Sequence, residues 1–420
     1  MKILNISGYD TVGALANGYF LHKEYLKRGH ESSMAVYTRR SLDKEVRRIS
    51  GPVFRWINER AAWLEERLSL HSMIVPGALP LYFTSMYRNA DIIHIHLPHV
   101  ARFFSILNLP VMSRNPARPV VLSFHDMFMM TGACHYSLDC ENWLTGCRSC
   151  PDICRTYILT KDRMEFMWKV KKWAMDRSSL AIVVGSDWQL DLARRSPILS
   201  RFPCVKIPYA LDTSIFHPMD QEFCRLRLGI PRDADVISFR SVPYRKNFKG
   251  HDYIVRALRE YQPKRETYLL TFEAVGGLEE FDGKYRIVDV GWTLNQRLVA
   301  MALAASDIFL MPSIAEGFGL MAIESMAVET PVIVFEGTAL PETVRAPKGG
   351  LAIPQDHMAL ADAVKTLLGN DELRKTMGRF GADTVRRENN EALYTQRYLE
   401  LYESLLEKAG RKNPAERIQD

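Results

Sequence analysis

Two glutamates separated by a glycine-rich turn are the residues of this chain best suited to chemistry. Glu316 precedes Gly317 and Gly319, and Glu324 lies one turn into a helix that we expect to start near Leu320. Backbone N–H groups in such a turn, together with the positive end of the helix dipole, favour an anion. Carboxylates on either side could accept hydrogen bonds from sugar hydroxyls. The pattern suits a nucleotide-linked sugar, although a solvated helix start with glutamates favoured by the dipole would look the same over this short stretch.

Four closely spaced cysteines form a second group of reactive side chains. They are Cys134, Cys140, Cys147 and Cys150, and the last two make a C-x-x-C pair. Thiolates at such spacing in a reducing compartment suit a tetrahedral zinc ion. A loop of packed or redox-labile thiols fits the spacing equally well. If zinc binds, the protein fills all four positions, so the metal would be structural.

Length and composition limit the kind of protein that carries these groups. The chain has 420 residues, 47% of them hydrophobic and 25% charged, with a net charge of +6. These values are typical of a globular chain of two to three domains. No stretch reaches the roughly 18 apolar residues that span a bilayer, and the N-terminus does not resemble a secretory signal. We therefore expect a cytoplasmic protein whose mild basic excess fits phosphate-bearing or membrane-surface partners, with no block of basic residues that indicates nucleic acid.

The first half of the sequence predicts a β-α-β beginning followed by further buried parallel strands. Apolar runs lie at 3–6, 34–37, 91–96, 119–124 and 180–184. Open α/β sheets bind ligands at the carboxyl ends of such strands. His125 ends one run, and His94 and His96 end the run before it. Of the latter two, we expect one to be structural.

Two basic, aromatic segments interrupt this half. Residues 39–90 predict an amphipathic helical insertion that contains Trp56 and Trp63, and residues 163–177 predict a helix that mixes aromatic residues with lysines. In both, we prefer the interpretation that the apolar side packs against the protein's own core. The alternative is a peripheral contact with an anionic membrane, which basic residues and interfacial tryptophans favour.

The second half restarts the alternation of strands and helices. Expected strands lie at 236–239, 268–272, 286–290, 308–311 and 332–335, and expected helices at 252–261, 296–304, 320–328, 358–368 and 372–387. The fold class is therefore α/β, with two doubly wound Rossmann-like domains facing a cleft. We place the domains at 1–205, with insertions at about 39–90 and about 131–155, and at 206–388. Residues 389–420 form a last helix and tail that return to the first domain.

The string around the two glutamates resembles the signature of the GT-B glycosyltransferases, in particular the retaining family 4. That signature is a glutamate, seven residues and a second glutamate, after a strand and through a glycine-rich turn, and Glu316-GFGLMAI-Glu324 matches it. Ser306-Asp307 before the strand and Gly337–Glu342 after the next strand extend the resemblance. Glu329 departs from it, because the family usually has glycine there. The resemblance covers residues 1 to about 405 and is strongest over 236–345.

The resemblance also implies which residues meet the donor. An arginine that ends the second domain's first strand and a lysine shortly after it face the donor diphosphate in this family. Here they are Arg240 and Lys249, with Lys246 as a competing lysine that we prefer less. His125 would lie beside the transferred sugar. The residues expected to bind the donor are Gly13, Lys246, Gly317, Phe318, Gly319, Leu320 and Glu324. The simpler alternatives are a strand-end ion pair for Arg240 and a capped strand end for His125.

The implied function is transfer of a hexosyl unit, with retention, from a nucleoside diphosphate sugar to a glycan or a polyprenyl-diphosphate-linked acceptor. Arg240 and Lys249 would stabilise the departing diphosphate, while Glu316 positions the sugar and Glu324 the ribose. The resemblance implies no protein nucleophile and no catalytic metal. The cysteine-rich stretch resembles the colanic-acid and O-antigen branch, which implies surface polysaccharide or lipopolysaccharide synthesis at the cytoplasmic face of the inner membrane.

Two other functions stay open on the sequence. A GT-B sugar-nucleotide epimerase or hydrolase would use the same donor without an acceptor. A non-catalytic, zinc-containing module could bind an anionic polymer such as nucleic acid, which the positive charge and the cysteines permit. The two glutamates argue against that module, because a polyanion binder gains nothing from carboxylates in its site.

Overall fold

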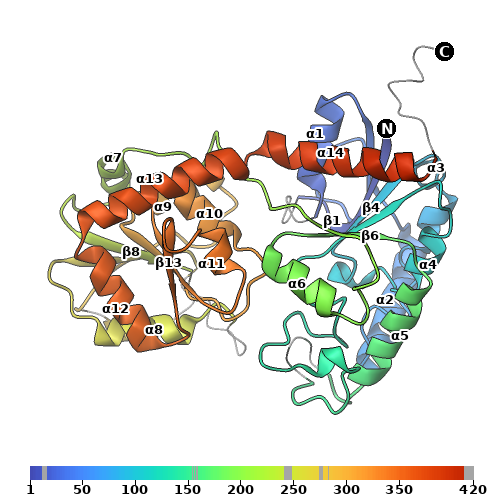
Figure 1. Ribbon diagram of the computed structural model, residues 1–420, viewed down its shortest axis with the longest axis horizontal. Helices are drawn as coiled ribbons and strands as arrows, with labels where there is room; N and C mark the ends of the chain where they lie inside the picture. Colours follow the sequence, from blue (N-terminus) through green and yellow to red (C-terminus); the bar gives the residue numbers. More distant parts are fainter. Residues whose placement is uncertain are drawn as a thin grey trace. The chain divides into compact units, whose positions relative to one another are not determined.

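The chain folds into two compact units, which we describe separately. The computed structural model describes residues 1–11, 17–153, 155, 157, 159–240, 248–273, 278–281 and 283–410. Unit 1 comprises Met1–Ile207 and the chain from Thr395 onward, and unit 2 comprises Pro208–Tyr394. The division falls two residues after the first boundary expected from the sequence and six residues after the second. Each unit holds a parallel sheet with helices, so the α/β class is confirmed (Figure 1).

Unit 1 is built on a parallel sheet in the order β3-β2-β1-β4-β5-β6-β7. Its strands are β1 (Lys2–Tyr9), β2 (Glu31–Thr38), β3 (Val46–Arg48), β4 (Ile92–His96), β5 (Val120–Ser123), β6 (Ala181–Val184) and β7 (Cys204–Lys206). The order reverses between β1 and β4, which is the topological switch point where open α/β sheets bind ligands. Both β4 and β5 are buried along their whole length, as continuous apolar runs predict.

Helices cover this sheet and complete unit 1. They are α1 (Tyr19–Lys27), α2 (Pro52–Arg67), α3 (Ser85–Arg88), α4 (Asn108–Met112), α5 (Met164–Asp176), α6 (Asp187–Arg195) and the greater part of α14 (Glu391–Lys408). None of the described helices combines the length and the apolar composition of a membrane-crossing segment.

The C-terminal helix α14 is fixed to the sheet of unit 1 by a chain of hydroxyl and imidazole groups. The Tyr402 hydroxyl lies 2.6 Å from His94 Nδ1 and accepts a hydrogen bond of 3.1 Å from the Tyr25 hydroxyl. His94 Nε2 lies 2.7 Å from Ser123 Oγ, which in turn lies 3.2 Å from the Tyr398 hydroxyl. His94 is therefore a structural residue that ties β4 and β5 to the last helix.

Unit 2 repeats the same architecture on a smaller scale. Its parallel sheet has the order β10-β9-β8-β11-β12-β13, so β8 and β11 flank the switch point. The strands are β8 (Asp235–Phe239), β9 (Thr267–Thr271), β10 (Arg286–Asp289), β11 (Ile308–Met311), β12 (Val332–Phe335) and β13 (Gly350–Ile353). The helices are α7 (Gln221–Arg227), α8 (His251–Glu260), α9 (Gln296–Ala304), α10 (Leu320–Ala327), α11 (Leu340–Thr343), α12 (His357–Leu368) and α13 (Asp371–Glu388).

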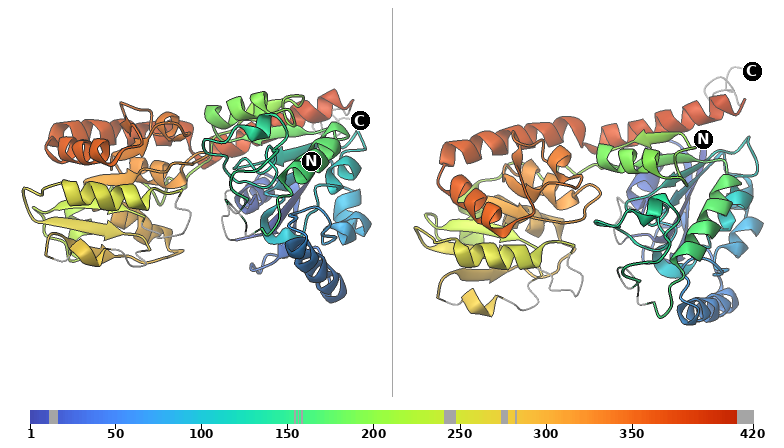
Figure 2. Two further views of the ribbon diagram at one scale, coloured as in Figure 1. Left: turned by 90° about the horizontal axis from the view of Figure 1, so that it is seen from below. Right: turned by 60° about the horizontal axis from the view of Figure 1, so that its bottom comes forward.

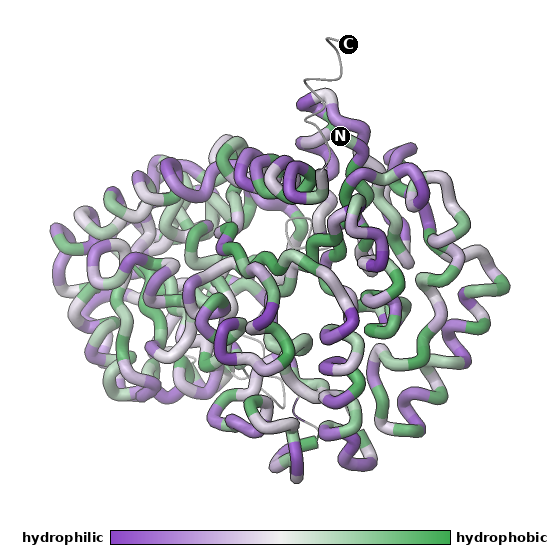
Figure 3. Tube along the Cα trace, turned by 45° about the vertical axis from the view of Figure 1, so that its right-hand side comes forward, coloured by the Kyte–Doolittle hydropathy of each residue, from purple (hydrophilic) through white to green (hydrophobic). Residues whose placement is uncertain are grey.

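Each sheet lies in its own hydrophobic core. One cluster of buried apolar side chains surrounds the sheet of unit 1, and a second joins the sheet of unit 2 to α8 and α12. Along many of the outer helices hydrophobic and hydrophilic residues alternate, as expected for helices with one buried face (Figure 3). These cores hold the carboxyl ends of the strands in place, and the candidate functional residues follow those ends.

Helix α2 does not follow this pattern, and the sequence-based preference for a core-packed apolar face is wrong there. Its buried side chains are Asn58 and Glu65, whereas Trp56 is 59% and Trp63 48% exposed. Glu65 accepts hydrogen bonds from the backbone N–H groups of residues 72–74, at 2.6 to 3.0 Å. The helix is thus attached to the unit through its polar residues and turns an apolar stripe outward at the margin of unit 1 (Figure 2).

Candidate functional site

Several residues that the sequence analysis predicted to bind the donor lie at the switch point of unit 2. Strands β8 and β11 pair in register, with Phe239 beside Leu310. Arg240 directly follows β8, and Glu316 lies in the loop after β11. The two side chains therefore belong to the same end of adjacent strands. Ligands of doubly wound sheets bind at this position.

A glycine brings Lys249 to this place. Gly250 has φ of +78°, and a Cβ atom there would lie 2.0 Å from the carbonyl oxygen of Pro312, so only glycine fits. The same contact is reinforced by a hydrogen bond of 2.9 Å from the Ile314 N–H to the Phe248 carbonyl. As a result Lys249 Nζ lies 2.5 Å from Glu316 Oε2. The preferred lysine and the first glutamate thus meet in the structure.

A second glycine starts the helix that carries Glu324. Gly319 is the N-cap of α10 with φ of +98°, and a Cβ there would lie 2.4 Å from Leu340. The turn before it is held by Thr343, whose hydroxyl donates to the Phe318 carbonyl at 2.6 Å. The predicted glycine-rich turn followed by a helix is therefore present. The first N–H groups of α10 have no partner one turn earlier within the helix, which is the arrangement that receives anions.

Glu324 lies in a low-dielectric environment within α10. Burial raises the pKa of its carboxyl to about 7, and the nearby Arg240 guanidinium opposes that rise. Arg240 follows β8 and Glu324 lies in the helix that follows β11, so both belong to the same switch point. Around neutral pH this carboxyl can therefore be protonated or ionised, depending on small changes in its surroundings.

Glu273 is a residue of this site that the sequence reasoning missed. It lies two residues after the end of β9, and its Oε2 accepts hydrogen bonds from Arg240 Nη2 at 2.8 Å and from Arg240 Nε at 3.2 Å. Its backbone has φ of +83°, which is rare for a residue with a side chain. The sequence could have indicated Glu273 only by its position, because it is the first acidic residue after β9, the strand next to β8. Glu273 holds the Arg240 side chain in an oriented ion pair.

Two predicted donor residues, Gly13 and Lys246, lie outside the described residues. The structure brings together the others of unit 2, namely Arg240, Lys249, Glu316, Gly317, Phe318, Gly319, Leu320 and Glu324. Glu329, which departs from the family pattern, has φ of +66°. It therefore adopts the conformation that glycine would take at this turn, away from the ends of β8 and β11.

In unit 1, His125 lies two residues after the end of β5, near His94 and His96. Burial, with a contribution from the charge of His125, lowers the pKa of His94 well below its usual value and that of His96 to about 3. His96 Nε2 lies 3.1 Å from Asn5 Oδ1, on the neighbouring strand β1. Both strand-end histidines are therefore neutral and structurally engaged. The sequence had expected only one of the two to be structural.

The four cysteines of the insertion surround one small pocket, which Trp143 and Met164 also line. All four are free thiols. Burial raises the pKa of Cys134 to about 11 and that of Cys147 to about 12. Among the described residues, no three of these sulfur atoms come close enough together to share an ion. Structural zinc at this pocket stays a prediction.

Lys171 organises the loop that precedes these cysteines. It lies in α5, and its side chain is fully buried, which is rare for a lysine. Its Nζ donates to the backbone carbonyls of Phe128, Thr131 and Gly132 at 2.6, 3.1 and 2.8 Å. The ammonium group thus satisfies three carbonyls of a buried loop that has no regular secondary structure. The helix itself is confirmed, and it packs against the core through Met167 and Ala174.

Comparison with known proteins shows which proteins unit 2 resembles. Residues 234–370, most of unit 2, match the family model described as "Glycosyl transferases group 1". A D-inositol 3-phosphate glycosyltransferase of Corynebacterium efficiens is 31% identical over 202 residues, which cover 44% of this chain and 47% of that protein. The chain thus spans about half the length of the curated relatives that it matches. Over most of unit 2 the chain is therefore similar to the group 1 glycosyl transferases.

Solved structures extend the likeness to both units. Sucrose-phosphate synthase from Thermosynechococcus elongatus has a TM-score of 0.66 at 18% identity, covering 97% of this chain and 99% of that one. Anabaena HepE in complex with UDP-glucose has a TM-score of 0.65 at 14% identity, covering 96% and 100%. At these identities the likeness concerns the fold alone. The two units of the chain have the fold of the GT-B glycosyltransferases.

Proposed function

We propose that this protein transfers a hexosyl unit, with retention, from a nucleoside diphosphate sugar to a hydroxyl group of a glycan or lipid-linked acceptor. The observation that carries the proposal is the grouping of two cations and two glutamates at the switch point of unit 2. Arg240 and Lys249 offer fixed positive charge to a diphosphate, and the start of α10 offers backbone N–H groups. Glu316 and Glu324 offer carboxylates to hydroxyls of the sugar and the ribose.

The chemistry follows from how these groups are held. Breaking the bond between the sugar and the diphosphate leaves negative charge on phosphate, and cations already in place stabilise it without reorganisation. In the described structure each cation is paired with a glutamate, Lys249 with Glu316 and Arg240 with Glu273. A bound diphosphate would exchange these partners for phosphate oxygens and release Glu316 toward the sugar. The donor phosphate would help to deprotonate the acceptor hydroxyl, so no protein nucleophile is required.

Binding of the donor is the first test. Purified protein is melted with UDP-, GDP-, ADP- and dTDP-sugars, because a ligand of the folded state raises the melting temperature by mass action. We expect one base to respond and Arg240→Ala to abolish the response. Arg259→Ala is the matched control, since Arg259 pairs with Glu280 on the exposed side of α8 through two similar hydrogen bonds. A response that survives Arg240→Ala would contradict the proposed site.

Product analysis separates transfer from the other chemistry of this fold. With the responding donor and an acceptor glycan, a transferase gives a lengthened glycan and free nucleoside diphosphate. A hydrolase gives free sugar without any acceptor, and an epimerase gives an altered sugar nucleotide. Retention is read from the anomeric configuration of the new linkage by NMR.

We also propose that the acceptor is carried by a membrane of anionic lipid, as in surface polysaccharide or lipopolysaccharide synthesis. The support is the outward stripe of α2, where Val53, Trp56, Ile57, Trp63 and Leu64 are between 38% and 70% exposed. At 3.6 residues per turn, positions 53, 56, 57, 63 and 64 fall on one side of the helix. Arg60 and Arg67 lie over the rings of Trp56 and Trp63, at 5.6 and 4.1 Å from the ring centres. Aromatic rings and arginines together fit a lipid interface.

Vesicle binding tests this part of the proposal. Full-length protein is sedimented with vesicles of phosphatidylcholine alone and with phosphatidylglycerol added. We expect binding only to the anionic vesicles, and we expect Trp56→Ser/Trp63→Ser to weaken it at least tenfold. Trp292→Ser is the control, because Trp292 is 63% exposed but lies in unit 2. Equal binding by both variants would remove α2 from the interface.

A further inference from the structure

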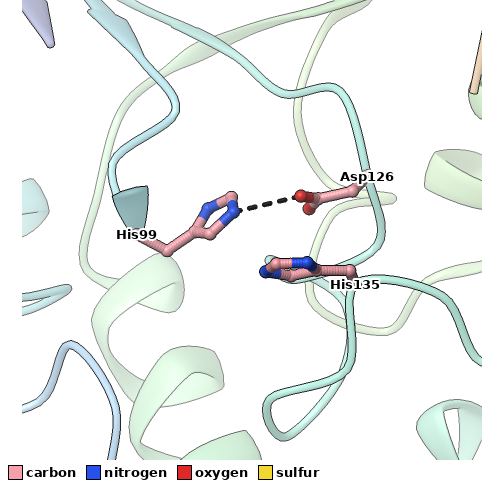
Figure 4. Close-up of side chains that lie close together, drawn as sticks. All are labelled: His99, Asp126 and His135. Atoms are coloured by element: carbon pink, nitrogen blue, oxygen red, sulfur yellow. Dashed lines mark ion pairs between the residues drawn. The ribbon is translucent and has the colours of Figure 1, made fainter. Parts of the chain in front are cut away.

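Two histidines and an aspartate converge beyond the carboxyl ends of β4 and β5. His99 lies shortly after β4, Asp126 shortly after β5, and His135 within the cysteine-rich insertion, next to Cys134. One side-chain nitrogen or oxygen from each lies within 4.8 Å of the other two, and His99 Nε2 is 3.0 Å from Asp126 Oδ2. Figure 4 shows the three side chains pointing toward one another from separate stretches of chain. They come from parts of the sequence 36 positions apart at most (99 to 135), which is why no short motif reveals them.

Contacts behind the three side chains fix their orientation. The other carboxylate oxygen of Asp126 accepts a hydrogen bond of 2.9 Å from the Phe128 N–H, which leaves Oδ2 directed at His99. His135 Nε2 lies 2.7 Å from the Tyr157 hydroxyl, so the ring of His135 is held at its far nitrogen. Supporting contacts of this kind are what metal-binding imidazoles and carboxylates have around them.

A second layer supports these contacts in turn. The ring of His71 stacks on that of Tyr157 at 3.8 Å between centres, and His71 Nε2 lies 3.2 Å from the His99 carbonyl. One residue therefore braces both histidines of the cluster. The ring of His99 also stacks on Phe128, at 4.4 Å between centres and with 24° between the planes. The result is an oriented set of donor atoms, in which His99 is buried and Asp126 and His135 are partly buried.

We propose that His99, Asp126 and His135 bind one divalent transition-metal ion, with Zn²⁺ as the ion best matched to two imidazoles and a carboxylate. Three protein ligands leave a coordination position for water or for an oxygen of a bound molecule. A buried ion pair between His99 and Asp126 is the simpler explanation of two of these residues. That ion pair does not explain why the His135 ring also faces His99 and Asp126 and is held in this orientation by Tyr157. The proposed site is separate from the cysteine pocket and independent of the transferase assignment.

Metal titration of a variant with fewer cysteines tests the site. Cys140→Ser/Cys150→Ser removes two of the four thiols and leaves Cys134 and the buried Cys147 unchanged. The chelator-treated full chain with these changes is titrated with Co²⁺ and Zn²⁺. We expect one equivalent to bind, with d–d absorption from Co²⁺ and without the near-ultraviolet thiolate charge-transfer band. Absence of any binding in this background would overturn the proposal.

Two substitutions assign the ligands. Asp126→Asn and His135→Gln are each expected to weaken Zn²⁺ binding by about 100-fold or more in calorimetry. His217→Gln, an exposed histidine of unit 2, is the matched control and should bind as the parent does. Circular dichroism shows whether each variant folds. Substitutions of Asp126 and His135 could disturb folding, because both residues lie close to a core. X-ray absorption of the zinc-loaded parent identifies the metal ligands without any substitution. Unchanged affinity in a folded His135→Gln variant, or a first shell of sulfur rather than imidazole nitrogen, would contradict the site.

Discussion

The carboxyl ends of the two sheets carry their functional residues in different ways. In unit 2, Lys249, Glu316 and Glu324 are placed by short turns next to the strand or helix that holds them, and Gly250 and Gly319 decide where those turns go. In unit 1, His99, Asp126 and His135 come from three loops, and their positions depend on contacts with Tyr157, His71 and Phe128. A turn fixed by glycine is a local property of the sequence. A cluster fixed by side-chain contacts exists only once the loops have packed.

The two units also differ in how they hold their positively charged side chains. In unit 2 the cations lie in partly exposed ion pairs that a ligand can exchange. In unit 1, Lys171 of α5 is fully buried and bonded to three carbonyls of a loop, and burial lowers its pKa to about 7. Removing a partner from a buried charge costs far more than removing one from an exposed pair. The first arrangement is suited to binding and release, and the second to holding a loop in one shape.

The largest expected effect in this comparison is on catalysis. Lys249→Ala removes a fixed cation from the departing diphosphate, and we expect the transfer rate to fall by about 10²–10³-fold. The rate is measured from release of nucleoside diphosphate at saturating donor. Lys365→Ala on the exposed side of α12 should leave it unchanged. A rate for Lys249→Ala close to that of the parent would show that the ion pair with Glu316 has no catalytic role.

The glycine turn of unit 2 can be broken directly. Gly250→Ala introduces a Cβ that would lie 2.0 Å from the Pro312 carbonyl oxygen, at φ of +78°. We expect a loss of about 3 kcal/mol in the free energy of unfolding. Gly229→Ala is the matched control, because its φ is +71° and its Cβ would meet nothing within 4 Å. It should cost about 1 kcal/mol, from the backbone conformation alone. Equal losses in urea unfolding would mean that the close approach to Pro312 does not hold the turn.

A substitution in α14 tests the hydrogen-bond network that joins this helix to the sheet of unit 1. Tyr402→Phe removes the hydroxyl that joins Tyr25 and His94, and it leaves buried polar groups without that partner. We expect the protein to lose about 1–2 kcal/mol of stability in denaturant unfolding. Tyr268→Phe, on a half-buried strand position of unit 2, should change stability by less than about 0.5 kcal/mol. A neutral Tyr402→Phe would show that packing alone holds α14.

The smallest expected effect is a pH dependence of donor binding. The folded-state pKa of Glu324 is raised from 4.5 to about 7, so its carboxyl is protonated in the folded protein at pH 6 and ionised at pH 8. An ionised carboxylate accepts hydrogen bonds from ribose hydroxyls better than a protonated one. We therefore expect the dissociation constant of the nucleotide to fall by up to about tenfold between pH 6 and pH 8. Calorimetry measures it, and Glu324→Gln should remove the dependence.

The same pKa has a consequence for stability, with a defined sign. Between pH 4.5 and pH 7 the unfolded chain ionises this glutamate while the folded chain keeps it protonated. The contribution of Glu324 to stability is therefore greatest below pH 4.5 and is lost as the pH rises toward 7. Glu324→Gln should be relatively more stable near neutral pH. A difference between Glu324→Gln and the parent that does not vary with pH would contradict the raised pKa.

The sequence by itself determined the elements and the local part of the site. Continuous apolar runs predicted β4, β5, β6, β8, β11 and β12, because parallel strands are buried on both faces. The resemblance to family 4 implied that Arg240 and Lys249 group with Glu316 and Glu324, and the turns at Gly250 and Gly319 produce that grouping in the structure. The pattern could not predict Glu273, whose role depends on β9 lying next to β8.

Only the tertiary structure decided which polar residues would be buried and which apolar residues exposed. Glu65 binds backbone N–H groups of the loop that follows α2, and Asn58 binds backbone groups of Gly77 and Arg102, so the apolar stripe of the helix faces outward. Lys171 is buried because three carbonyls of a loop need a donor. The cluster of His99, Asp126 and His135 follows from the same cause. A polar group enters a core where another part of the chain supplies its partner, and the identity of that partner is a property of the fold, not of the local sequence.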